Sequence, residues 1–186
     1  MNPLARIAFV ATAGLMLAGI VHLGSVLAIP RLTKPNADDR LAPLVPLHTM
    51  TLMPRAEPGS AGLPFADPAA AIAVCRFDLS ARPVRVEATP GGAFMSFAFY
   101  TPTGGVFYAL TDRSATRGKL EVVLVTQAQL EELQANDPED EPVSELRLVA
   151  PGRTGFVTVR TLAMEPGLLE DAEARLRTAR CGDAGG

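Results

Sequence analysis

Residues 94–100 read FMSFAFY, and in this stretch large apolar side chains alternate with small ones. Met95, Phe97 and Phe99 fall on one side of an extended chain, while Ser96 and Ala98 fall on the other, because successive side chains of a β-strand point to opposite faces. Glycine-rich turn signals flank this stretch at 91–92 and 104–105. The stretch predicts a β-strand with one face on a hydrophobic core.

Similar short runs of valine, phenylalanine and leucine surround this stretch and predict six further strands. They cover residues 72–79, 84–88, 106–110, 120–125, 145–149 and 155–162. Thr126 and Gln129 form a capping-box pattern that predicts a short helix to Ala135, and Pro166 predicts the start of a second helix through Arg180. The apolar stripe of this second helix consists of Leu168, Leu169, Ala172 and Leu176.

This order of elements predicts a mainly β (α+β) domain. We expect an antiparallel β-sandwich or half-barrel with a C-terminal helix, preceded by one N-terminal transmembrane helix. The expected domain covers residues 64–182, and residues 183–186 are expected to be a disordered tail.

Residues 7–29 carry no formal charge, and as a helix they span roughly 35 Å, enough for the hydrocarbon core of a membrane. They predict a transmembrane anchor, with residues 1–6 as a cytoplasmic tail. A cleaved secretory signal peptide is the alternative, because Arg6 gives a short basic region and residues 26–28 form an acceptable cleavage triplet.

One face of this anchor carries small residues and a histidine. Its members are Ala11, Gly14, Ala18, His22 and Ser25. Small residues let membrane helices approach closely, and a histidine in hydrocarbon needs a hydrogen-bond partner. The stripe predicts an interface with a second membrane helix, and ordinary membrane-helix composition is the alternative.

Residues 30–68 hold eight of the 16 prolines, which disfavours long helices and central strands. We interpret residues 30–63 as a proline-rich tether. His48 lies within it, and a solvent-exposed loop histidine is the expectation, with a ligand or base folded over the domain as the alternative.

Two cysteines bear on the cellular compartment of the domain. Cys75 lies in a predicted strand and Cys181 near the C-terminus, and in an oxidising compartment they would close a loop of about a hundred residues. Two unpaired thiols are the alternative. Together with the short N-terminal tail, this favours a domain outside the cytoplasm.

Composition and motifs exclude several classes of function. The chain has 17 basic and 20 acidic residues and a net charge of −3, which fits neither a disordered polyelectrolyte nor a nucleic-acid-binding protein. No histidine follows His48, so a Ser-His-Asp or Cys-His arrangement within the domain would require that residue. The sequence predicts no catalytic residue, cofactor or metal site.

Arg76 and Arg113 lie in or beside apolar strands, where an isolated charge is costly, so structural ion pairs are the first interpretation. A second interpretation groups them with Tyr100 and Tyr108 around a cleft for a small anionic or lipid-like ligand.

A resemblance extends these expectations. Residues 65–68, 73–80 and 82–86, together with the strand 94–100 and the run 106–113, resemble the bacterial family called domain of unknown function 1254, in its short membrane-anchored branch. The likeness covers about residues 63–182. The chain departs from the family's pattern at Met95, where a large aromatic residue is usual, and at Thr101, where an acidic residue is usual.

The resemblance implies a β-sandwich-like domain in the bacterial envelope. It also implies a companion anchored protein that carries the related domain of unknown function 1214, and it brings no catalytic residues. We therefore expect a single-pass protein of the bacterial inner membrane with its domain in the periplasm. A non-enzymatic accessory or assembly module that binds the companion or a second copy is the leading expectation. A tethered small-ligand or lipid-binding domain is the alternative, and an enzyme is third.

Overall fold

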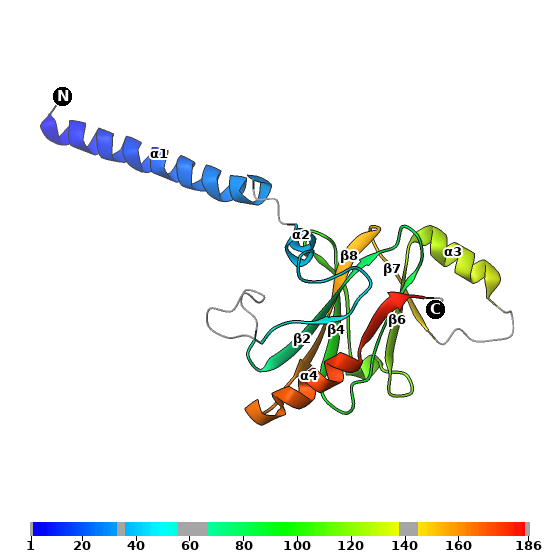
Figure 1. The fold of residues 1–186 in the computed structure, drawn as a ribbon. Helices are drawn as coiled ribbons and strands as arrows, with labels where there is room; N and C mark the ends of the chain where they lie inside the picture. Colours follow the sequence, from blue (N-terminus) through cyan, green and yellow to red (C-terminus); the bar gives the residue numbers. More distant parts are fainter. Residues whose placement is uncertain (1, 33–35, 56–66, 138–144, 185–186) are drawn as a thin grey trace. The chain divides into compact units, whose positions relative to one another are not determined.

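The computed structural model describes residues 2–32, 36–55, 67–137 and 145–184, which belong to two compact units divided after Pro35. The first unit is the helix α1 (Pro3–Leu32) (Figure 1). Within it, the segment Pro3–Ile29 is long and apolar enough to cross a membrane by length and composition, with a mean hydropathy of 2.0.

The second unit contains two sheets. Sheet 1 has the strand order β1 (Thr51–Leu52), β2 (Ala70–Asp78), β8 (Thr154–Leu162), β4 (Met95–Tyr100), β5 (Val106–Thr111). Sheet 2 has the order β7 (Leu146–Val149), β6 (Leu120–Val125), β3 (Val84–Ala88), β9 (Arg180–Asp183). All neighbouring strands are antiparallel except β6 and β7. The predicted α+β fold with mostly antiparallel strands is confirmed.

The hydrophobic core lies between the facing sides of the two sheets. Met95, Phe97 and Phe99 of β4 are fully buried, as their alternation predicts, and Val84 and Val86 of β3 meet them from sheet 2. Every second residue of β3 and β4 therefore contributes to the core, which specifies the register of both strands.

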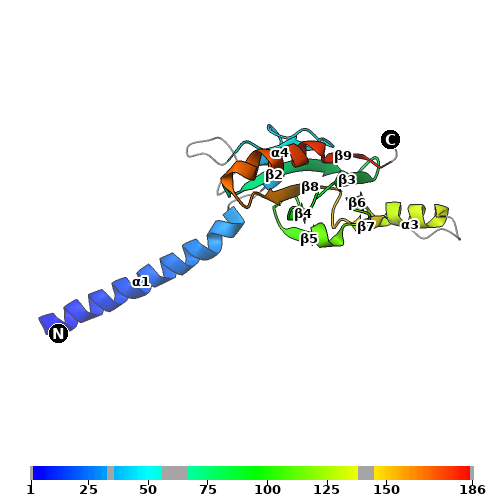
Figure 2. The same ribbon diagram turned by 90° about the horizontal axis from the view of Figure 1, so that it is seen from below.

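Two helices complete the domain. α4 (Leu169–Thr178) contacts β2 and β8 and buries Ala172 and Leu176 in the core (Figures 1 and 2). α3 (Gln127–Asn136) follows β6 and buries none of its side chains. The predicted capping box at its N-terminus is present, with Thr126 Oγ1 accepting from the Gln129 amide at 3.3 Å.

The predicted tether is wrong for residues 36–55, which form part of the second unit. α2 (Ala37–Leu41) and β1 lie in this stretch, and Leu41, Val45 and Met53 form a second hydrophobic cluster with Val74 and Phe156 on the outer face of sheet 1. Prolines permit this because a five-residue helix and a two-residue edge strand fit between them. Residues 56–63 of the tether, and residues 64–66 of the expected domain, lie outside the described residues.

The predicted tail is also wrong at its first residue, because Asp183 belongs to β9 and the Ala184 amide donates to the Pro83 carbonyl at 2.9 Å. The sequence pattern does not predict this strand, since its four residues show no apolar alternation. Residues 185–186 lie outside the described part of the chain.

A disulfide joins the two sheets through β2 and β9. Cys75 of β2 is bonded to Cys181 of β9, with the Cα atoms 6.5 Å apart. The structure therefore contains the disulfide and not the alternative of two unpaired thiols.

Candidate functional site

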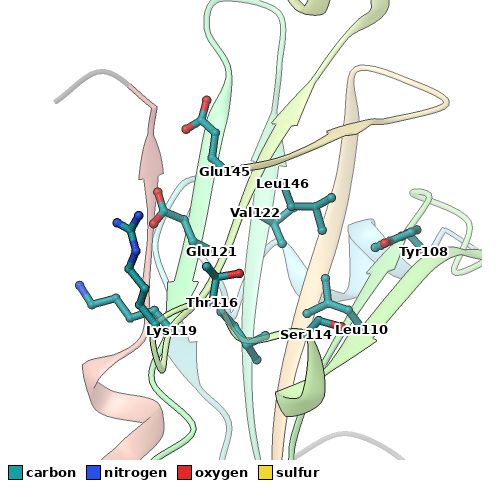
Figure 3. Close-up of a pocket in the computed structure, with 11 residues that line it drawn as sticks. Tyr108, Leu110, Ser114, Thr116, Lys119, Glu121, Val122, Glu145 and Leu146 are labelled. Carbon is teal, nitrogen blue, oxygen red and sulfur yellow. The ribbon is translucent and has the colours of Figure 1, made fainter. Parts of the chain in front are cut away.

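A cleft of about 720 Å3 lies between β5 and β7 (Figure 3). Each of these is an edge strand of its sheet, and the two edges leave one side of the sandwich open. Apolar and polar side chains share the wall of the cleft. The lining residues are Tyr108, Leu110, Ser114, Thr116, Arg117, Lys119, Leu120, Glu121, Val122, Glu145 and Leu146.

The floor of the cleft is apolar. Leu110 of β5 and Leu120 and Val122 of β6 are buried, while Leu146 of β7 is 40% exposed. In Figure 3, Tyr108 and Leu110 lie on one side and Val122 and Leu146 on the other. Both sheets thus contribute apolar surface, and the gap between their last strands keeps part of it accessible to solvent.

A tight hairpin turn forms the rim beside β6. Thr116 and Lys119 exchange backbone hydrogen bonds of 2.9 and 3.1 Å, and Arg117 and Gly118 between them have φ angles of 53° and 78°. Positive φ at both central positions is typical of the type I′ turn, which only glycine adopts without strain. Within the described residues, no carboxylate lies within salt-bridge distance of the Arg117 or Lys119 cation.

The acidic residues of the rim are engaged by arginines. Arg85 of β3 pairs with both Glu121 and Glu145, the latter at 3.2 Å. Arg147 pairs with Glu145 at 3.0 Å and binds both carboxylate oxygens of Asp137, and its hydrogen bonds hold the pKa of the Asp137 carboxyl below its usual value. The Asp137 carboxylate is therefore a poor proton acceptor at neutral pH.

The four residues predicted for a ligand cleft are not brought together. Only Tyr108 lines the cleft; Arg113 is exposed on the 3-10 turn Asp112–Ser114. Tyr100 stacks on Phe156 on the outer face of sheet 1, with ring centroids 4.8 Å apart. Arg76 also points to this outer face, which residues 36–55 cover, so half of the predicted set faces away from the cleft.

Arg76 forms a structural ion pair. Its Nε and Nη2 donate to the two carboxylate oxygens of Asp38 at 2.6 and 2.7 Å, and both side chains are about 15% exposed. These hydrogen bonds to Asp38 raise the pKa of the guanidinium further above its usual value. A third bond reaches the Val45 carbonyl at 3.4 Å. The pair attaches α2 to sheet 1.

His48 is not the exposed loop residue that the sequence predicts. Its side chain is 29% exposed, Nδ1 lies 3.1 Å from Asp183, and Nε2 accepts from the Asp78 amide at 3.1 Å. The His48 amide also donates to the Arg76 carbonyl. The imidazole therefore continues the edge beyond β1, because it satisfies the Asp78 backbone amide at the end of β2, beside which no strand of the described residues lies on this side.

The small-residue stripe of α1 is fully exposed within its own unit. Ala11, Gly14, Ala18, His22 and Ser25 are all exposed on the helix surface, and a side chain added at Gly14 would meet open space. The stripe is available for another helix. Within the described residues, no group of three histidine, cysteine or carboxylate side chains lies close enough to hold a metal ion.

No family model and no curated protein matches the chain. Two solved structures are similar in fold: the VPA0106 protein from Vibrio parahaemolyticus, with 11% identity and a TM-score of 0.55, and an uncharacterized protein from Burkholderia cenocepacia, with 16% identity and a TM-score of 0.43. The matched regions cover 36% and 34% of these two structures, and 81% and 75% of this chain. It spans about a third of each neighbour, and the first of these similarities supports the fold alone.

Proposed function

We propose that this protein is a non-enzymatic accessory or assembly module of a bacterial envelope. Its apolar helix α1 anchors it in the inner membrane, with the disulfide-linked domain in the periplasm. There the domain binds an anchored companion that carries domain of unknown function 1214, or a second copy of itself. The apolar length of α1 and the disulfide support this placement.

The exposed edge of β5 carries the proposal. Val106 is 57% exposed and Tyr108 is 36% exposed, and among the described residues β5 pairs with β4 alone. The stretch from Gly104 to Thr111 contains no charge and no proline. Charged residues and prolines usually protect the edge strands of monomeric proteins from pairing with other chains. An apolar edge without them is therefore typical of a surface that binds another protein.

Affinity capture from detergent-solubilised membranes tests the proposal. Tagged wild type is compared with Val106→Lys on β5, with Gly14→Leu and His22→Leu on α1, and with the control Met164→Lys, whose site is 84% exposed on a loop. The companion, or a differently tagged copy, should co-purify with wild type and the control and be reduced in at least one interface variant. Absence of both proteins from the wild-type sample contradicts the proposal.

The cleft supports a second candidate function, in which the domain binds a small amphipathic ligand. An apolar floor with hydroxyl groups from Tyr108, Ser114 and Thr116 and the cations of Arg117 and Lys119 at the rim is a common composition for a ligand pocket. A medium-chain fatty acid serves as the probe. It should raise the melting temperature of wild type but not of Leu146→Glu, at a cleft position that is 40% exposed, and an equal response in both proteins contradicts specific binding.

A further inference from the structure

We infer that a second copy of this chain pairs with β5 edge to edge, so that two copies of sheet 1 form one continuous antiparallel sheet across a two-fold axis. This inference rests on the proposed function and names the partner at its binding surface. In such a pair, the unpaired backbone groups of one β5 would bind those of the other.

The geometry of β5 limits where pairing occurs. Against β4, the register is regular from Tyr108 opposite Phe99 to Thr111 opposite Ser96, and it shifts between Phe99 and Tyr100. A bulge bends its strand, so the end near Val106 is less suited to regular pairing. Residues 108–111 therefore form the flat part of the edge, and exposed Val106 borders it.

The sequence of the edge is compatible with itself. In an antiparallel pair with Ala109 opposite Ala109, Tyr108 lies opposite Leu110, and the first charged residue, Asp112, lies opposite Val106. No like charges meet, and apolar side chains face one another along the pair, which is the favourable arrangement for neighbouring strands. The β5 strand of one copy can therefore pair with the β5 strand of another copy, without a partner of different sequence.

Anchoring in a membrane explains why so short an edge suffices. Four paired residues bury far less than the roughly 1,200 Å2 typical of stable complexes, so the domain alone should associate weakly. Two copies held in one membrane meet at a high effective concentration, which strengthens weak contacts without new ones. The α1 helix and the β5 edge are thus expected to act together.

Photo-crosslinking in membranes tests this inference on the full chain. Benzoylphenylalanine replaces Tyr108 in one sample and Met164, at a highly exposed loop site after β8, in the control. Irradiation should yield a product of twice the chain mass of 19.6 kDa from the Tyr108 site alone. Adding Ala109→Lys at this exposed position should reduce that product about tenfold, because two ammonium groups would lie directly opposite each other across the two-fold axis.

The alternative outcomes separate the two proposals. A Tyr108 product that contains the companion protein overturns the second copy as partner and leaves the proposed function intact. Equal homodimer product from both sites, or no product while differently tagged copies still co-purify, overturns pairing through β5. If no crosslinked product forms and neither the companion nor a differently tagged copy co-purifies, both the inference and the proposed function are overturned.

Discussion

Replacing Arg76 by alanine removes the cation of the ion pair that attaches α2 to sheet 1. Breaking a buried pair costs about 3–5 kcal/mol, because the remaining charge stays desolvated. Since Arg76 and Asp38 are each about 15% exposed, partial hydration of Asp38 reduces this cost, and we expect a loss of about 2–4 kcal/mol. For a domain of this size, this lowers the melting temperature by roughly 5–12 °C.

Arg113→Ala is the matched control, because this arginine lies in a sequence context that also predicts an ion pair but is exposed in the structure. It should change the free energy of unfolding by less than about 0.5 kcal/mol. Urea unfolding of residues 36–186, followed by circular dichroism, compares both variants with Asp38→Ala. Equal losses for Arg76→Ala and Arg113→Ala, or no loss for Asp38→Ala, would refute the structural role of the pair.

Three further predictions concern other parts of the domain. Loss of the disulfide in Cys75→Ala/Cys181→Ala should cost up to about 5 kcal/mol, since the bond closes a loop of 106 residues; unchanged urea unfolding contradicts this. Gly155→Ala would place Cβ 2.3 Å from the Tyr100 carbonyl oxygen and should destabilise by more than about 2 kcal/mol, whereas Gly152→Ala has open space and should be neutral in the same assay. Hydrogen bonds from Arg55 lower the pKa of Glu173, so its contribution is present above the usual pKa near 4.5 and is lost as pH falls below it. Glu173→Gln should therefore lose less free energy of unfolding than wild type as the pH is lowered through this range. The same loss in both proteins would contradict the prediction.

The strands were predictable because their pattern is local. Alternation of buried and exposed residues in β4, for example, follows from chain geometry alone, and the structure contains a strand at each of the seven predicted positions. The short elements α2, β1 and β9 were not predictable. They have two to five residues each, and they form because the rest of the domain offers them a surface.

The cleft was less predictable than the fold. Leu110, Leu120 and Val122 look like core residues in the sequence, and they line a cleft only because β5 and β7 end their sheets on the same side. Arg76 and Arg113 also look alike in sequence. What separates them is Asp38, a partner 38 residues before Arg76, which local pattern does not reveal.

The position of β8 has a consequence for the order of events during synthesis. Every other strand of sheet 1 has been synthesised by Thr111, yet β2 and β4 lack the strand between them until Leu162 has emerged. At about 5–20 residues per second, this leaves two half-sheets with unpaired inner edges for roughly 2–10 seconds. A nascent chain in this state exposes the apolar residues of both strands to aggregation, so a general holding chaperone should be most important for this protein while β8 is being made.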